Sequence, residues 1–137
     1  MAKQTFIKIL GPPILSAIKA LEEVAVSMPD VCIMDTIITN EIPRSLRRGL
    51  GGQVMGREFK RDPRIAEFAY SYYRSSGVVI NRERCESIFS QSGASLGDYD
   101  FYFEWTKKIT SAEYEEFLGK IDEKLTPLGC YYSIMNK

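Results

Sequence analysis

A strand, a helix and a second strand follow one another near the start of this chain, and the pattern constrains the fold more than any other feature. Residues 5–10 are rich in β-forming side chains, and Gly11-Pro12-Pro13 then ends the strand and favours a helix start. Apolar residues recur at helical spacing over 14–24, and a second β-rich run covers 31–39. The first third of the chain therefore predicts one β-α-β unit.

The last third of the chain repeats this pattern. Over residues 99–105 the odd positions are aromatic and the even ones mostly polar, which is typical of a half-buried strand. Thr110 to Glu113 has the form of a capping box, and an apolar helical stripe follows it as far as Leu125. A closing strand is predicted over 130–135.

Two β-α-β units with helices on one face of a mainly antiparallel sheet resemble the ferredoxin-like split βαβ fold of the α+β class. The resemblance lies in the order of the elements and covers 4–40 and 98–136, the predicted core of a single domain spanning 1–137. The chain departs from the plain ferredoxin-like pattern in the long connection between the two units, residues 43–97. We call this stretch the connecting segment and predict that it is a helical insertion.

Within the connecting segment, Asp62-Pro63 predicts the start of a helix that ends near Ser75-Ser76-Gly77. A short strand is expected over 78–80, and Asn81 is expected to cap a further short helix. The residues expected to face inward are Ile65, Phe68, Ala69, Tyr72, Cys85, Ile88 and Phe89.

The charges of the chain are segregated, although its 18 basic and 18 acidic side chains cancel. Residues 1–43 carry a net charge of −2, residues 44–84 carry +6 and residues 85–137 carry −4. All nine arginines lie in the middle stretch. Because arginine differs from lysine in making planar, bidentate contacts with carboxylates and phosphates, this stretch is predicted to be specialised for binding.

The strongest candidate site is the part of this stretch that is rich in both arginine and glycine. Three arginines on one turn of a helix over 44–48 would oppose the helix dipole unless an anion compensates them. Nearby glycines let the backbone approach a partner closely. The candidate anion- or partner-binding residues are Arg44, Arg47, Arg48, Gly51, Gly52, Gly56, Arg57, Arg61 and Arg64. The alternative is that these arginines pair with the chain's own acidic C-terminal third or with a second subunit.

Known phosphate-binding motifs do not match the candidate site. Gly51 and Gly56 have the spacing of a P-loop, but Arg57 and Glu58 stand where lysine and a hydroxyl residue are required. A dinucleotide-binding motif also fails, because Val54 occupies the position of its last glycine. The sequence therefore predicts no nucleotide-binding loop.

RNA or single-stranded nucleic acid is one alternative partner, because basic and aromatic residues are interleaved in the connecting segment. Helical spacing assigns Phe68 and Tyr72 to the core, which leaves Tyr70 and Tyr73 as candidates for base stacking. The consensus motif of ferredoxin-like RNA binders is absent, and core packing is the expected role of the aromatic row over 99–105.

A small enzyme is a second alternative, although the chain has no histidine and so lacks histidine bases and ligands. Asp98, Asp100 and Glu104 share one face of a predicted strand, where they form either a cation or proton site or an ordinary solvated face. Ferredoxin-like chains also pair into barrels, so a dimeric barrel acting on an anionic small molecule belongs to this class. No cofactor or metal is predicted.

Cysteine usage and hydropathy favour a cytoplasmic location. The three cysteines are widely spaced and are expected to be buried and reduced. No signal-peptide pattern and no run long enough to cross a bilayer is seen, so no membrane is expected.

These observations together predict a non-catalytic binding or accessory subunit in a larger complex. We expect it to present its Arg/Gly-rich stretch to an anionic partner, with an acidic protein surface favoured over nucleic acid. A protein partner or a homo-oligomer is therefore expected.

Overall fold

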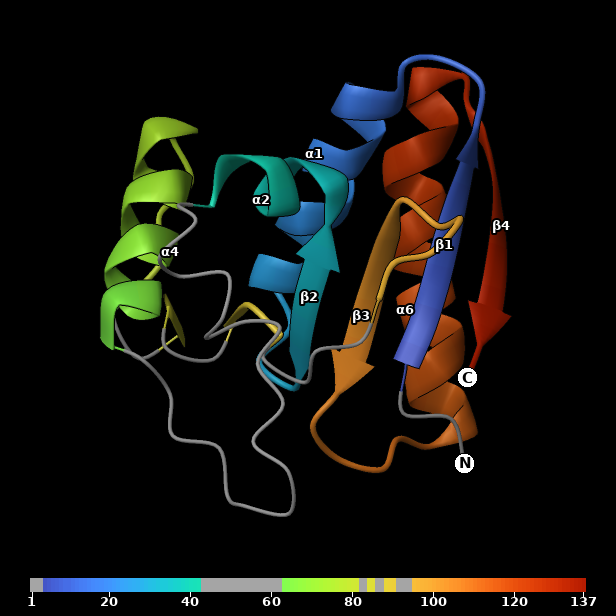
Figure 1. The fold of residues 1–137 in the computed structure, drawn as a ribbon. Coiled ribbons are helices and arrows are strands. Elements are labelled where there is room, and N and C mark those ends of the chain that lie inside the picture. The colour runs from blue at the N-terminus through green and yellow to red at the C-terminus, as the bar shows by residue number, and fades with distance from the viewer. Residues whose placement is uncertain (1–3, 43–62, 82–83, 86–87, 91–94) are drawn as a thin grey trace.

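A computed structural model shows an α+β fold with a four-stranded antiparallel sheet, compatible with a ferredoxin-like arrangement (Figure 1). The structure describes residues 4–42, 63–81, 84–85, 88–90 and 95–137. Its strands are β1 (Gln4–Leu10), β2 (Val31–Asp35), β3 (Phe101–Trp105) and β4 (Tyr131–Asn136). Their order across the sheet is β2-β3-β1-β4, so strands from the two predicted units alternate.

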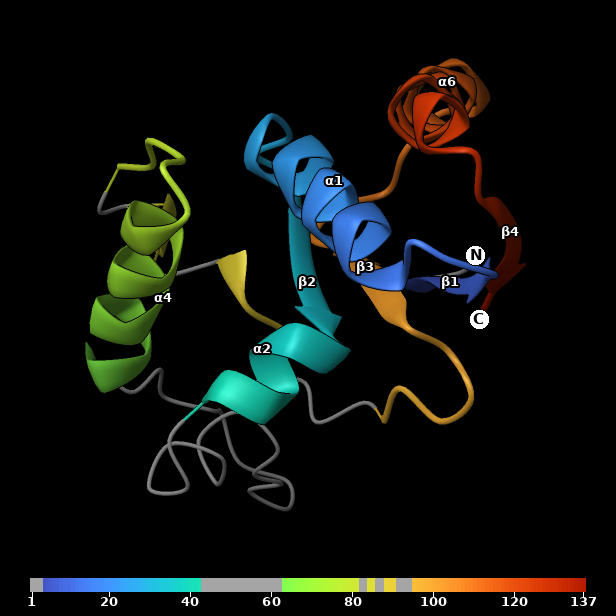
Figure 2. The ribbon, with the colours of Figure 1, turned by 90° about the horizontal axis from the view of Figure 1, so that it is seen from above.

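Two long helices cover one face of the sheet, α1 (Ile14–Val26) and α6 (Ser111–Leu125) (Figure 2). The capping box at the start of α6 is confirmed: Thr110 Oγ1 accepts a hydrogen bond from the Glu113 N–H at 3.1 Å, and Glu113 Oε1 accepts one from the Thr110 N–H at 3.0 Å. A short 3-10 turn, η1 (Thr126–Leu128), follows α6, and Gly129 at φ +74° then turns the chain into β4. The apolar stripes of both helices face the sheet and form the core with it.

The prediction of one strand over residues 31–39 is wrong in its second half. Strand β2 ends at Asp35, and α2 (Thr36–Glu41) begins at the next residue. The Asp35 carboxylate accepts a hydrogen bond from the Ile38 N–H at 2.8 Å and so caps this helix. The cap and the burial of Ile38 outweigh the β preference of the Thr-Ile-Ile-Thr run.

The face of the sheet opposite α1 and α6 is covered in part by the chain that leads into β3. Residues 95–100 cross in front of β3 and β1 (Figure 1). The ring of Phe6 lies 5.3 Å from that of Tyr99 and 5.0 Å from that of Tyr102, measured between centroids. Tyr102 is consequently buried along with Phe101 and Phe103, so β3 is covered on both faces rather than half-buried as its alternation predicts.

Helix α4 (Pro63–Ser75), in the connecting segment, lies beyond β2 at one side of the molecule (Figures 1 and 2). Its predicted inward residues Ala69 and Tyr72 are buried. Residues 78–80 do not form the expected strand. The Val78 N–H instead donates a hydrogen bond to the Tyr73 carbonyl, which belongs to the C-terminal turn of α4. Instead, Phe89 forms a parallel β-bridge with Ile33 on β2.

The inward residues predicted after α4 are confirmed. Asn81 Oδ1 accepts a hydrogen bond from the Arg84 N–H at 2.7 Å, as a cap does. Cys85, Ile88 and Phe89 are buried, and so are the other two thiols, Cys32 and Cys130.

Among the described residues, no helix has the length and apolar character needed to cross a membrane.

Candidate functional site

The Arg/Gly-rich candidate site falls almost entirely on residues that the structure does not describe. Arg44, Arg47, Arg48, Gly51, Gly52, Gly56, Arg57 and Arg61 lie outside the described residues. Arg64 is described and lies exposed in the first turn of α4. The structure therefore leaves the proposed clustering of these residues as a prediction.

One arginine of the basic stretch has a structural role. Arg84 is half-buried, and its Nη2 donates hydrogen bonds to the carbonyl oxygens of Ala25 at 3.0 Å, Met28 at 2.8 Å and Val31 at 2.6 Å. Carbonyls at the end of a helix lack partners within it, and a cation there also favours the helix dipole. Arg84 thus joins the connecting segment to the turn between α1 and β2.

A second connection runs from α4 to a buried acidic cluster, which we define as Glu22, Asp35, Tyr72 and Tyr73. The Tyr72 hydroxyl donates to Glu22 Oε2 at 2.6 Å and accepts from Lys19 Nζ at 2.9 Å. Only 3 % of Glu22 is exposed, although a charged side chain on a helix is expected to be solvated. Burial, followed by the hydrogen bond to Glu22, raises the pKa of Tyr72, so its hydroxyl keeps the proton that it donates.

Asp35 is the most deeply buried carboxyl group of this cluster, with no exposed surface. Its Oδ1 caps α2, whereas its Oδ2 has no hydrogen-bond partner. Burial, and next the neighbouring Glu22 carboxyl, raise the pKa of Asp35 well above its ordinary value. These groups are enclosed by α1, β2 and α4, and the hydrogen bond between Tyr72 and Glu22 joins α4 to α1.

The opposite edge of the sheet presents a different kind of surface, the outer edge of β4 (Figure 1). Gln4 and Lys137 exchange both backbone hydrogen bonds, at 3.2 and 2.9 Å. Because antiparallel pairs alternate along a ladder, the N–H and C=O groups of residues 131, 133 and 135 point toward β1. Those of Tyr132, Ile134 and Asn136 point outward, where no described strand pairs with them.

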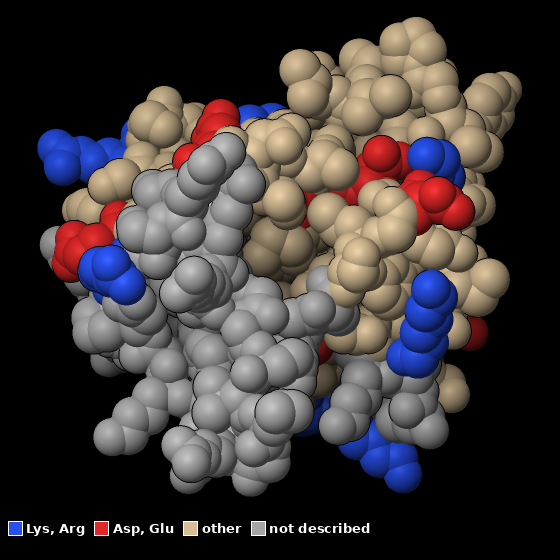
Figure 3. Space-filling view, viewed as in Figure 1, with Lys and Arg blue, Asp and Glu red and all other residues tan. Residues whose placement is uncertain are grey.

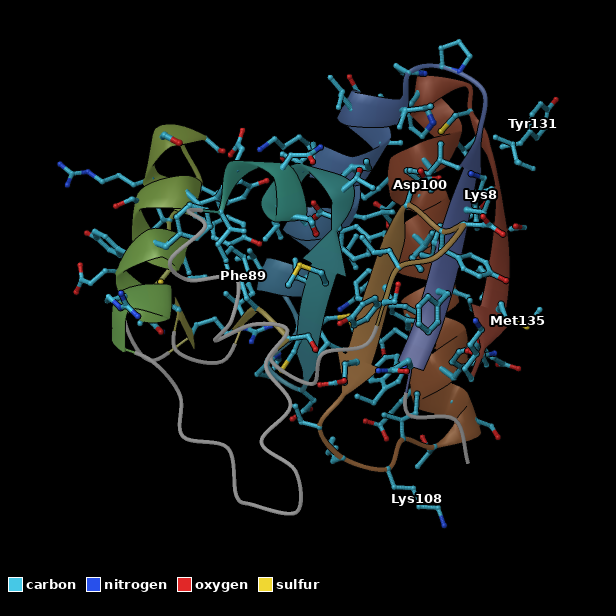
Figure 4. All side chains as sticks on the ribbon, viewed as in Figure 1. Lys8, Phe89, Asp100, Lys108, Tyr131 and Met135 are labelled. Carbon is cyan, nitrogen blue, oxygen red and sulfur yellow. The ribbon has the colours of Figure 1, made fainter. Side chains whose placement is uncertain are left out.

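Exposed apolar side chains lie on one face of this edge. Tyr131 is 79 % exposed and pairs in register with Leu10, which is 48 % exposed. Tyr131 and Met135 point away from the molecule (Figure 4). We define the apolar patch as Leu10, Tyr131 and Met135, which lie on the same face of the β1–β4 ladder. Charged atoms lie over the upper part of β1, where Lys8 pairs with Asp100, and the surface above them is uncharged in Figure 3.

The two edges of the sheet differ in their protection. On the β2 edge, the Ser90 N–H donates to the Ile33 carbonyl at 2.8 Å, and Phe89 packs beside the strand (Figure 4). The β4 edge has no such cover among the described residues. Its sequence, Tyr131–Asn136, also has no charged residue and no proline, the usual means of preventing edge-to-edge pairing.

Asp100, just before β3, and Glu104 on β3 bond to protein groups in place of the cation considered from the sequence. Asp100 Oδ2 accepts from the Ile9 N–H at 2.8 Å, and Glu104 accepts from Gln4 at 3.0 Å and from Ser90 at 3.2 Å. Within the part of the chain that the structure describes, no group of three or more His, Cys, Asp or Glu side chains is placed to hold a metal ion.

The stacking role considered for Tyr73 is also wrong, because its ring is buried against Tyr72 and Phe89. Sequence reasoning missed the buried acidic cluster, because its charge assigned Glu22 to the solvated face of the helix, although Glu22 lies four residues after the buried Ile18. One usable signal was present: an aspartate that ends a strand and precedes Thr36 is a good helix cap.

Comparisons of this chain with protein-family models, with curated proteins and with solved structures found no match.

Proposed function

We propose that this protein is a non-catalytic binding subunit that assembles with another protein chain through its β4 edge. The observation that carries the proposal is the outer edge of β4, whose backbone groups are unpaired among the described residues, together with the adjoining apolar patch. A strand added there would satisfy the outward groups of Tyr132, Ile134 and Asn136. It would also remove apolar area from water, which favours association by about 25 cal/mol per Å².

A second copy of the chain is the partner that the strand itself favours. Two β4 strands can pair antiparallel about a twofold axis, because such an interface uses the same surface on both subunits. Since Tyr131–Asn136 carries no charge, this pairing brings no like charges together. The assembled dimer would have one continuous sheet of eight strands.

The Arg/Gly-rich stretch is the second contact surface of this proposal, directed at an acidic protein. Five described carboxylates pair with lysines: Asp30 and Glu113 with Lys107, Glu23 with Lys124, Asp100 with Lys8, and Glu22 with Lys19. These five carboxylates have partners within the core, which supports an external partner for the arginines. From the strand order β2-β3-β1-β4 we also infer a split βαβ scaffold in which residues 43–97 are an insertion.

The self-association is tested by light scattering coupled to size-exclusion chromatography, over micromolar to millimolar protein concentrations. The wild-type chain is expected to form a dimer, and the double variant Tyr131→Lys, Met135→Lys is expected to be monomeric. The introduced lysines would face their symmetry mates across the twofold axis and repel one another.

Val79→Lys is the matched control, because Val79 is a 94 % exposed apolar residue that follows α4, on the side of the molecule away from β4. This variant should dimerise as the wild type does. A wild-type monomer at every concentration, or equal loss of the dimer in Val79→Lys, would show that β4 is not the contact surface.

A further inference from the structure

A pocket of about 440 Å³ opens between the start of α6 and the ends of β1, β3 and β4, on the helix-covered face of the sheet. Its walls include the ring of Trp105, the side chain of Ile109 and the ring of Tyr114. Trp105 and Tyr114 both contact Phe117, with ring centroids 4.8 and 6.0 Å from it. Two aromatic walls held by one buried ring make a concave and largely apolar site of the size that small molecules occupy.

A chain of hydrogen bonds crosses the floor of this pocket. The Trp105 Nε1–H donates to Thr5 Oγ1 at 3.1 Å, and Thr5 Oγ1 donates to Asn136 Oδ1 at 2.8 Å. Asn136 Nδ2 then donates to the Tyr114 hydroxyl oxygen at 2.8 Å. Thr5 and Asn136 are direct register partners on β1 and β4, and as a pair without backbone bonds between them their side chains lie especially close.

The direction of this chain is set by the indole, because a tryptophan N–H can only donate. Thr5 must accept from it, so the Thr5 proton goes to the Asn136 carbonyl oxygen, and the Asn136 amide turns its N–H toward Tyr114. Tyr114 accepts this bond and makes no other hydrogen bond within the described residues. Its own O–H is therefore left to donate into the pocket.

The charge of the lining determines which ligands are compatible. Among the described residues, those that line the pocket include Glu115 and no Lys or Arg. The capping box already uses the Thr110 N–H and the Glu113 N–H at the start of α6. In this described lining an anion would meet a carboxylate and no basic side chain, so the lining disfavours negative charge.

We propose that this pocket binds a compact heteroaromatic molecule that has a hydrogen-bond acceptor and no negative charge. The two aromatic walls contact the ring, and the Tyr114 hydroxyl donates to its acceptor atom. This site is independent of the outer edge of β4, because Asn136 turns its side chain to the face covered by α6.

The chain contains a single tryptophan, so the indole N–H resonance of Trp105 in a ¹H–¹⁵N spectrum reports on this pocket alone. Quinoline supplies a neutral ring with one acceptor nitrogen, and quinoline-2-carboxylate supplies the same ring with a negative charge. Quinoline is expected to shift the Trp105 resonance saturably, and the carboxylate is expected to leave it in place. A missing saturable shift with quinoline, or equal binding of the anion, would overturn the proposal.

Tyr114→Phe keeps the aromatic wall and removes the donor, so it should weaken quinoline binding by about 3- to 10-fold, as expected for one hydrogen bond. Tyr131→Phe is the control, because this tyrosine is exposed on the other face of the sheet and should bind quinoline as the wild type does. Unchanged affinity in Tyr114→Phe, with an intact fold shown by the rest of the spectrum, would contradict the assigned role of the hydroxyl.

Discussion

At Asp35 one carboxyl group both caps a helix and lies buried beside a second acidic side chain. Oδ1 stabilises α2 by accepting from Ile38, but Oδ2 has no partner and faces the region of Glu22. A charged carboxylate in this place is costly, because burial removes its hydration and Glu22 repels it. Protonation of Asp35 relieves both costs.

The pH dependence of stability follows from the raised pKa of Asp35. The folded chain holds this proton more tightly than the unfolded chain, so above the ordinary aspartate pKa unfolding releases a proton. Asp35 therefore lowers the free energy of unfolding as the pH rises from the unfolded pKa to the folded one, and its contribution is most favourable in acid.

Asp35→Asn should remove this dependence while keeping the helix cap, because the amide oxygen can still accept from the Ile38 N–H. Its stability relative to the wild type should increase as the pH is raised from 4 to 8, measured by urea unfolding at each pH. Asp98→Asn, at an exposed position, should show no such trend. A constant difference between Asp35→Asn and the wild type at all pH values would contradict the assignment.

Helix α4 is held against the core by few polar groups and several aromatic contacts. Tyr72 reaches both Glu22 and Lys19 on α1, and the rings of Tyr72 and Tyr73 lie 5.9 and 6.1 Å from Phe89. Because α4 begins at Pro63, its attachment to the core also fixes the position at which residues 43–62 of the connecting segment end.

Tyr72→Phe should loosen α4 selectively. The substitution leaves the buried Glu22 carboxylate without its 2.6 Å donor, which costs about 1–3 kcal/mol. Amide hydrogen exchange of residues 63–75 should accelerate more than that of β1 and β3, because local opening of α4 becomes easier. Equal acceleration throughout the sheet would show instead that Tyr72 contributes only to global stability.

Over the whole molecule, the distribution of charge separates residues that maintain the fold from those available for binding. Arg84 belongs to the basic stretch but serves the fold through three carbonyl contacts. The arginines from 44 to 61 lie in the part of the connecting segment between α2 and α4. The number of these arginines, and the glycines that lie among them, still predict a contact surface for an acidic partner.

Arg47→Glu with Arg48→Glu should weaken binding to immobilised polyglutamate, measured as a lower salt concentration for elution, with a nearly unchanged melting temperature. Lys108→Glu with Lys120→Glu makes the same change in net charge elsewhere and should elute near the wild-type position. A sharp fall in melting temperature in the arginine variant would show that these arginines pair within the protein. Stronger, steeply salt-dependent binding to single-stranded oligonucleotides would favour nucleic acid.

The elements that follow from local chemistry were predictable. The capping box at Thr110, the apolar stripe of α6 and the start of α4 at Pro63 all involve neighbours along the chain, and the structure contains each of them. The end of β2 was not predicted correctly, because a β-branched run and an aspartate cap compete for residues 36–39, and the burial of Ile38 decides between them.

The sequence by itself determined the repeated β-α-β order, the helix boundaries set by caps and prolines, and the concentration of arginine in one segment. Only the tertiary structure decided which edge of the described sheet has no partner strand among the described residues, that Glu22 and Asp35 are buried together, and that Thr5, Trp105, Tyr114 and Asn136 meet around one pocket. The physical reason is range: caps and helical stripes act over a few residues, whereas these sites join side chains that are distant in sequence and adjacent only after the strands pair.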